Sequence, residues 1–227
     1  FCDADDVVSP GWVAALHAAL AADVVAAGPW EFRRLNPSVA EADRWGPTTF
    51  CPPVGVPLPA AGSGNLGIRA DLYALLGGFD EHLRVGEDID LCWRAQLAGR
   101  QLLEVPDAVL HVRFRAEPTR AFRQAFAYAG SDRQVAFKYR RVIDAYAAAY
   151  PDLARGVKDV PARTAWPRRA YLCVRKIAAE LARLRHPGGA VLVSSEIGEW
   201  LGLRLTSVDR TVDVVVPPAT LPEPVDV

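Results

Sequence analysis

The chain has 227 residues, of which 51% are hydrophobic, with a mean hydropathy of +0.07 and a formal net charge of −1. This is enough apolar material for a real core, and one domain with an appendage is the natural count. No run of 18 apolar residues occurs, so we expect no membrane-spanning helix in this segment. The four cysteines are scattered, without a Cys-x-x-Cys pair, which predicts neither a zinc site nor a disulfide framework and favours a reducing compartment.

The small net charge hides an uneven distribution along the chain. Residues 1–112 carry 15 acidic and 7 basic side chains, whereas residues 113–141 carry 8 basic and 2 acidic ones. The acidic part can gather cations, and the basic stripe can meet phosphate or anionic lipid. Two solvated faces of one domain would give the same counts, so charge alone leaves both interpretations open.

The first predicted helix is clearly marked. Ser9-Pro10 supplies a capping residue and a proline at the first helical position, and apolar residues then recur at helical spacing over Trp12–Ala22. Residues 23–28 are predicted to form a buried strand. From Arg33 to Gly62 prolines and glycines are frequent and periodicity is lost, which predicts a long surface excursion.

The next part of the chain alternates short strands and helices, which indicates an α/β fold. A flexible turn at Gly62–Asn65 leads into a short strand. The further predicted elements are a short helix from Asp71 to Gly77-Gly78, a helix over Ile89–Ala98, strands over Leu102–Val105 and Ala108–Val112, and a helix over roughly Thr119–Ala129.

Beyond residue 141 the chain changes character. We expect a helical extension over 142–213, in which Arg168–Arg185 forms a helix with apolar residues on one side and basic residues opposite. Such a helix can lie on a membrane surface, and packing onto the preceding domain with its basic side in water is an equally good interpretation. Residues 214–227 are rich in Pro, Val and Asp, which predicts a disordered tail.

The opening motif Phe1-Cys2-Asp3-Ala4-Asp5-Asp6 offers carboxylates for a divalent ion. If a strand ends at Cys2, then Asp3 and Asp5 lie on a turn at its carboxyl end, where open α/β sheets bind ligands. Mg²⁺ and Mn²⁺ prefer oxygen ligands, and magnesium typically takes one or two carboxylates together with substrate phosphates. The alternative is a turn whose aspartates, Asp6 above all, cap the next helix.

A second acidic motif, Gly86-Glu87-Asp88-Ile89-Asp90, begins a predicted helix. A carboxylate within hydrogen-bond reach of an acceptor hydroxyl can take its proton as a nucleophile forms. Acidic residues in a first helical turn also complement the helix dipole and are common there without any catalytic role.

Three further side chains have both a functional and a structural interpretation. His111 follows a strand-like segment and could supply a metal ligand through a neutral ring nitrogen, although such a histidine is more often packed or hydrogen-bonded. Trp93 and Tyr128 could act as platforms for a sugar ring, and packing in the core is the more common role for both.

The order of the motifs is more specific than any one of them. The chain reads Phe-x-Asp-x-Asp-Asp, Pro-Gly-Trp, Gly-x-Gly-Asn-Leu-x-Ile-Arg, Gly-Gly-Phe-Asp-Glu, Gly-Glu-Asp-Ile-Asp-Leu-Cys-Trp-Arg and Val-Pro-Asp-Ala-x-x-x-His. This series resembles the acceptor-side half of the GT-A-fold, family 2 glycosyltransferases over about Phe1 to Arg141. The resemblance implies a partial GT-A fold with a mixed, Rossmann-like sheet.

The resemblance also implies roles for particular residues. Asp5 would ligate Mn²⁺ or Mg²⁺, Asp3 would contact the donor's ribose or the metal and its waters, and His111 would be a third ligand. Asp88 would be the general base, with Glu87 beside it orienting the acceptor. Donor or acceptor binding is expected of four further residues: Gly64, Asn65, Asp90 and Trp93. The implied reaction is a single inverting displacement at the anomeric carbon of a nucleotide-sugar.

Two departures from the family pattern shape the expectations. The nucleotide-binding half would lie before Phe1, so we expect residues 1–141 to be the C-terminal part of the catalytic domain and to be inactive alone. The Gln-x-x-Arg-Trp motif of processive synthases is matched only by Gln124-Ala125-Phe126-Ala127-Tyr128. That difference predicts transfer of one or a few sugars to a glycan, lipid-linked or small-molecule acceptor.

Two other classes of protein compete with this interpretation. Asp3-Ala4-Asp5-Asp6-Val7 also fits the nucleophile loop of haloacid-dehalogenase-like phosphatases, although the first lysine after it is only Lys138. A degenerate, non-catalytic domain that binds glycans or partners is the third alternative. We expect no nucleic-acid partner, and a cytoplasmic location, at the inner face of the membrane if Arg168–Arg185 binds lipid.

Overall fold

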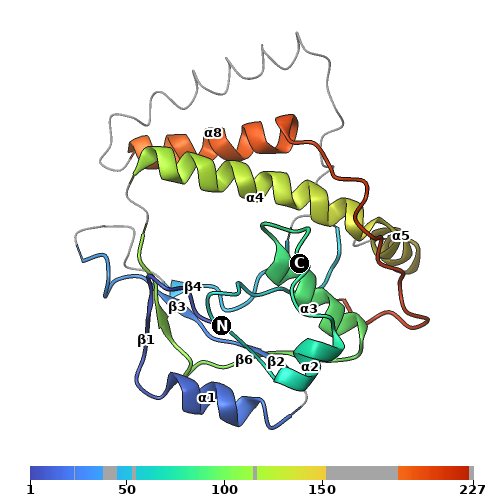
Figure 1. The fold of residues 1–227 in the computed structure, drawn as a ribbon, viewed down its shortest axis with the longest axis horizontal. Coiled ribbons are helices and arrows are strands. Elements are labelled where there is room, and N and C mark those ends of the chain that lie inside the picture. The colour runs from blue at the N-terminus through green and yellow to red at the C-terminus, as the bar shows by residue number, and fades with distance from the viewer. Residues whose placement is uncertain (23, 38–44, 53–54, 115–116, 152–188, 225–227) are drawn as a thin grey trace.

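The protein is a mixed α/β structure that contains two small mixed sheets. The computed structural model describes residues 1–22, 24–37, 45–52, 55–114, 117–151 and 189–224 (Figure 1). The first sheet has the strand order β5-β2-β6, formed by Leu66–Ile68, Val25–Ala27 and Leu102–Glu104. The second has the order β1-β7-β3-β4, formed by Val7–Val8, Leu110–His111, Trp30–Glu31 and Trp45–Gly46.

Two neighbouring stretches of chain pass from the first sheet into the second. Strand β2 pairs in parallel with β6, and after a short connection β3 pairs in parallel with β7. The two connections are pressed together, since a Cβ built on Gly28 would lie 1.8 Å from the carbonyl oxygen of Ala108. Only glycine allows this approach, which brings the carboxyl end of β7 next to the N-terminal turn.

Alternate residues of β2 face two hydrophobic cores. Ala26 packs with Leu16 of helix α1 (Trp12–Ala19) in the smaller core. Val25 and Ala27 belong to the larger core, which includes residues of α3 (Glu87–Leu97), α4 (Pro118–Lys138) and α5 (Arg140–Ala149). This alternation is the pattern of a strand buried on both faces, and it confirms the buried strand predicted for this segment.

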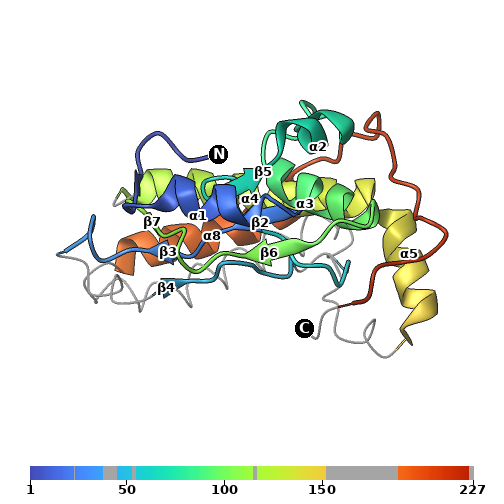
Figure 2. The same cartoon turned by 90° about the horizontal axis from the view of Figure 1, so that it is seen from below.

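Helix α8 (Gly189–Leu205) lies along α4 in both views (Figures 1 and 2). A Cβ at Gly198 would lie 2.4 Å from the carbonyl oxygen of Phe122, and one at Gly202 would lie 2.3 Å from that of Phe126. Both residue numbers rise together along the contact, so the two helices run in the same direction. The glycines let the two backbones approach closely, which fixes α8 against the helix that borders the candidate site.

The predicted surface excursion over Arg33–Gly62 is wrong for its second half. The buried residues described there include Val56, Leu58, Ala60 and Ala61 of the hydrophobic core. Side chains of α3 bind the backbone of this stretch, because Trp93 Nε1 donates to the oxygen of Leu58 at 2.9 Å and Gln96 Nε2 donates to that of Pro59 at 2.8 Å. An irregular segment can be buried when its carbonyl groups are satisfied in this way.

The expected helix 119–129 extends to Lys138, and α5 crosses the expected boundary at residue 141. Two hydrogen bonds join residues 214–224, for which composition predicts disorder, to α4 and α5. Val215 donates its backbone N–H to the oxygen of Lys138 at 2.9 Å, and the Tyr146 hydroxyl donates to the oxygen of Pro222 at 2.9 Å.

The expected helix Arg168–Arg185 lies outside the described residues. Within the part of the chain that the structure describes, no helix combines the length and apolar character needed to cross a membrane. The short helix α2 (Ala70–Leu75) follows strand β5 as expected. Gly77 and Gly78 come after this helix and both adopt positive φ angles.

Candidate active site

Asp3, Asp5 and Asp6 share one tight turn at the start of the chain. Cys2 forms an isolated antiparallel bridge with Asn65, and the turn then leads into β1. Each aspartate offers a carboxylate oxygen, and these three atoms lie within 4.8 Å of one another. The donor set is all oxygen and largely exposed, which fits a divalent cation such as Mg²⁺ or Mn²⁺.

Arg113, two residues beyond the end of β7, holds this turn. Its backbone N–H donates to Asp6 Oδ1 at 2.8 Å, and its Nε donates to the carbonyl oxygen of Asp5 at 3.3 Å. Burial raises the pKa of Asp6, the negative charges of Asp5 and Asp3 add to the rise, and Arg113 opposes it. Sequence analysis did not single out Arg113. The antiparallel register Val7↔His111 explains its position, since it continues to Asp5 opposite Arg113.

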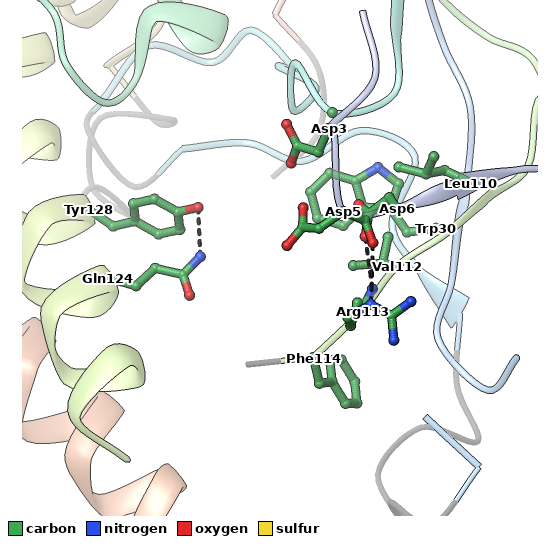
Figure 3. Close-up of a pocket in the computed structure, with 11 residues that line it drawn as sticks. Asp3, Asp5, Asp6, Trp30, Leu110, Val112, Arg113, Phe114, Gln124 and Tyr128 are labelled. Atoms are coloured by element: carbon green, nitrogen blue, oxygen red, sulfur yellow. Dashed lines mark hydrogen bonds between the residues drawn. The ribbon is translucent and has the colours of Figure 1, made fainter. Parts of the chain in front are cut away.

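A cavity of about 190 Å³ opens beside the turn. Figure 3 shows the three aspartates and Arg113 on one side, and Gln124 and Tyr128 projecting from α4 on the other. Gly64 also lines the cavity, and a Cβ at this position would lie 3.0 Å from Asp3 Oδ2. The remaining lining residues are Trp30, Leu110, Val112 and Phe114. Charged and aromatic residues therefore share one side of the cavity, and Gln124 and Tyr128 form the other (Figure 3).

Asp88 lies in the first turn of α3, after Gly86 at a φ of 82°. Its Oδ2 accepts the backbone N–H of Ser63 at 3.2 Å, and its Oδ1 accepts that of Ile89 at 2.8 Å. Burial raises the pKa of Asp88, these hydrogen bonds oppose the rise, and the charge of Asp3 adds to it. Burial also raises the pKa of Glu87, with smaller contributions from Asp88 and Asp3.

The two acidic motifs, 85 residues apart in the chain, thus lie within electrostatic reach of each other. Asp88 is not among the residues that line the cavity, but Trp30 lines the cavity and also lies close to Asp88. A Cβ on Gly62 would lie 2.6 Å from the indole ring of Trp30 and 3.8 Å from Asp88 Oδ2. Trp30 had not been identified from the sequence, because an aromatic residue in a two-residue strand has no pattern that separates a site from a core.

Asn65, expected to bind the donor, is buried and engaged within the protein. Its Nδ2 donates to the carbonyl oxygens of Pro29 at 3.1 Å and Ala108 at 2.9 Å. Its Oδ1 accepts the indole N–H of Trp12 at 2.7 Å. These three bonds join α1 to the connections between the two sheets, so Asn65 supports the backbone beside Asp3 and does not face the cavity.

Asp90 and Trp93, expected to bind donor or acceptor, are both fully buried. Asp90 forms ion pairs with Arg94 Nη2 at 2.7 Å and Lys138 Nζ at 2.5 Å, and accepts the hydroxyl of Tyr139 at 2.8 Å. Trp93 packs edge-on against the Tyr139 ring, with centroids 4.9 Å apart. Their helical positions face the core, so they hold α3 in place rather than contact a ligand.

Lys138 also forms an ion pair with Asp80 at 2.6 Å. It is the only lysine in the described part of the chain. Its burial in this network leaves it far better placed to neutralise Asp80 and Asp90 than to serve the phosphatase chemistry considered for the opening motif.

His111, the expected third metal ligand, has both ring nitrogens engaged. Nε2 lies 3.0 Å from Arg34 Nη1 and Nδ1 lies 2.6 Å from Glu31 Oε2. Arginine can only donate, so Nε2 accepts and Nδ1 carries the proton that it donates to Glu31. The ring lies one strand from the aspartate turn, and it would have to exchange Arg34 for a metal ion to act as a ligand.

Tyr128, for which the core was the expected location, is 54% exposed and lines the cavity. Gln124 Nε2 donates to its hydroxyl at 2.9 Å. The two residues lie four apart and therefore share one face of α4, which is the signal that the sequence offered.

No protein-family model matches the chain, and no curated protein matches it. The chemical interpretation therefore depends on the site itself and on the motif resemblance. A carboxylate cluster that can hold a cation lies near a second carboxylate, which is half-buried and oriented by two backbone N–H groups. This arrangement suits a reaction that neutralises an anionic leaving group and removes a proton from a nucleophile.

Proposed function

We propose that the protein is an inverting, metal-dependent glycosyltransferase that transfers a sugar from a nucleotide-sugar to an acceptor hydroxyl. The observation that carries this proposal is that neighbouring residues join the two acidic motifs: Ser63 donates its backbone N–H to Asp88 Oδ2 at 3.2 Å, and a Cβ on Gly64 would lie 3.0 Å from Asp3 Oδ2. The ordered resemblance to GT-A-fold, family 2 glycosyltransferases supports it, and the mixed α/β structure is compatible with that fold.

Asp3 and Asp5 would hold the divalent ion, because their carboxylates converge on the cavity side of the turn (Figure 3). A bound Mn²⁺ or Mg²⁺ supplies positive charge that offsets the charge on the departing diphosphate. Asp6 is tied to the backbone of Arg113 and keeps the turn in shape. Gly64 would leave room for Asp3 to adopt a ligating position, since any Cβ there presses on its carboxylate.

Asp88 would act as the general base. The hydroxyl oxygen of the acceptor forms a bond to the anomeric carbon while the bond from that carbon to the diphosphate oxygen breaks, and the hydroxyl proton passes to Asp88. The N–H groups of Ser63 and Ile89 orient the carboxylate, and burial strengthens it as a proton acceptor by raising its pKa. Glu87, beside it, would orient the acceptor. No covalent enzyme intermediate is required.

The acceptor would be a glycan, a lipid-linked sugar or a small molecule, and transfer would be non-processive. The aromatic and amide side chains that line the cavity on its two sides support a sugar-containing ligand, because aromatic faces stack on sugar rings and amides bind hydroxyl groups; they are Trp30, Phe114, Gln124 and Tyr128. A cytoplasmic location at the inner face of the membrane is part of the same proposal.

The test is release of nucleoside diphosphate by the full-length protein from a panel of nucleotide-sugars with Mn²⁺ or Mg²⁺. We expect metal-dependent release with one donor, lost in Asp5→Ala and in Asp88→Asn. Asp107→Asn, at an exposed aspartate outside the site, is the matched control and should retain release. No release with any donor, with candidate acceptors present, would contradict the proposal and favour a degenerate binding domain.

A further inference from the structure

We propose that Arg113 is a diphosphate-binding residue, whose guanidinium binds phosphate oxygens of a ligand while Asp3 and Asp5 hold the metal ion of that same ligand. This inference rests on the proposed function and adds to it a residue that recognises the anionic part of the donor. The argument comes from the way Arg113 is anchored, from its charge and from its place in the cavity.

The hydrogen bonds that anchor Arg113 fix the position of its guanidinium group and leave the two Nη groups for other contacts. The backbone N–H and Nε bind the aspartate turn at 2.8 Å and 3.3 Å. Among the described residues, no protein partner is found for either terminal nitrogen of this guanidinium. Arg113 is exposed and lines the cavity on the same side as the three aspartates (Figure 3), so its two Nη groups are accessible to a ligand that binds beside the turn.

The charge of Arg113 is unexpected for a residue whose only task is to support a cation site. A guanidinium beside Asp3, Asp5 and Asp6 repels a bare divalent ion and weakens its binding. This repulsion is offset when a diphosphate lies between the metal ion and Arg113, since some of its oxygens bind the metal ion and others bind the guanidinium group. Arginine presents a planar fork of donors that matches phosphate oxygens, which makes it the usual residue for this task.

Among the described residues that line the cavity, Arg113 is also the only one with a cationic side chain. Opposite it, Gln124 and Tyr128 are neutral and bonded to each other. Arg120, by contrast, is exposed and forms an ion pair with Glu117 at 3.0 Å, and it does not line the cavity. The positive charge available to an anion in this cavity is therefore concentrated at one residue.

The experiment is isothermal titration calorimetry with two probes, Mn²⁺ alone and a preformed complex of Mn²⁺ with inorganic pyrophosphate. Pyrophosphate lacks a base and a sugar, so its binding reports the diphosphate position alone. We expect Arg113→Gln to bind Mn²⁺ alone at least as tightly as wild type. The same variant should bind the pyrophosphate complex about 10- to 100-fold more weakly, which corresponds to a lost charge-assisted hydrogen bond.

Two controls separate charge and geometry from general damage. Arg113→Lys keeps the positive charge but lacks the fork and the Nε bond, and should give an intermediate affinity for the pyrophosphate complex. Arg120→Gln removes an arginine outside the cavity, and should leave both affinities unchanged. Circular dichroism of each variant shows whether it is folded.

The outcomes distinguish this inference from the proposed function. Unchanged affinity of folded Arg113→Gln for the pyrophosphate complex would overturn the role of Arg113 and leave the metal site intact. Loss of Mn²⁺ binding in Arg113→Gln would show that Arg113 only shapes the turn, which also overturns the inference. No Mn²⁺ binding by wild type, or binding that persists in Asp5→Ala, would contradict the proposed metal site itself.

Discussion

The backbone N–H of Ser63 lies 3.2 Å from Oδ2 of Asp88 and donates a hydrogen bond to it. The next residue, Gly64, lies against the carboxylate of Asp3, because a Cβ there would be 3.0 Å from Asp3 Oδ2. One short stretch of backbone thus contacts both acidic motifs. The separation of the candidate metal ligand and the candidate base is fixed by this stretch.

Replacement of Asp88 by asparagine should lower sugar transfer by about 10²- to 10⁴-fold, because the amide keeps the shape but cannot take a proton. The wild-type rate should fall as pH falls through the pKa of Asp88. Since burial raises that pKa, the midpoint should lie above about 3.9, the value of an exposed aspartate. A pH profile of kcat/KM measures it. A midpoint at or below that value would argue against Asp88 as the base.

Gly64→Ala should weaken Mn²⁺ binding by about tenfold, a typical effect of a change beside a metal ligand. The added methyl group presses on the Asp3 carboxylate and displaces it from the turn. Gly64 does not have a positive φ, so the backbone itself accepts alanine. Calorimetric titration with Mn²⁺ measures the change, and a thermal melt close to that of wild type shows that the effect is local. Wild-type affinity would place the metal away from Asp3.

Lys138→Met should lower the free energy of unfolding by about 3–5 kcal/mol, because it leaves the fully buried Asp90 without one of its two cationic partners. Urea denaturation measures this. Adding Asp90→Asn to the variant should recover part of the loss, since the uncompensated charge is then removed.

The matched control is Arg120→Met. Its partner Glu117 is 63% exposed, and Arg120 itself is 65% exposed. Surface pairs of this kind contribute about 1 kcal/mol or less. Equal losses in the two methionine variants would contradict the importance assigned to the buried network around α3.

Asp132→Asn should raise the free energy of unfolding at pH 7 by about 1–2 kcal/mol, after allowance for solvent screening. Burial, aided by the charge of Glu199 on α8, raises the pKa of Asp132 to about 6. The folded state therefore binds the carboxyl proton of Asp132 more tightly than the unfolded chain does. The free energy of unfolding consequently falls as pH rises from about 4 to 6.

The gain from Asp132→Asn should disappear below about pH 4, where the carboxyl group is protonated in both states. Glu199→Gln should give a smaller gain at pH 7, because it removes only the lesser cause of the raised pKa. Urea denaturation at pH 4 and pH 7 separates these cases. A gain of equal size at both pH values would show that charge is not the cause.

Local patterns in the sequence predicted much of the fold. The buried strand at β2, the short helix before Gly77-Gly78 and the helix that begins at the second acidic motif were all expected from apolar spacing and turn residues. Each of these depends on neighbours in the chain, which a single sequence displays. A turn at Asp3 and Asp5 was expected on the condition that a strand ends at Cys2, whereas Cys2 forms an isolated bridge with Asn65 and the first strand, β1, follows the turn.

The remaining features depend on contacts between distant residues. Burial of Leu58 and Ala60 requires side chains from α3 to bind the intervening backbone. The spacing of apolar residues in this segment does not predict that burial. Asn65 resembled a pocket residue, yet its amide joins α1 to the two sheet connections. Arg113 acquires its position from strand register, and Tyr128 from the face of α4 that meets the cavity. Such relationships exist only once the chain is folded.

The most direct test of the central claim is the anomeric configuration of the transferred sugar. Proton NMR reads it from the first product formed with the donor and acceptor that the release assay identifies. A single displacement assisted by Asp88 predicts inversion relative to the donor, with product absent without metal and strongly reduced in Asp88→Asn. Retention of configuration, or equal product from Asp88→Asn, would contradict the account.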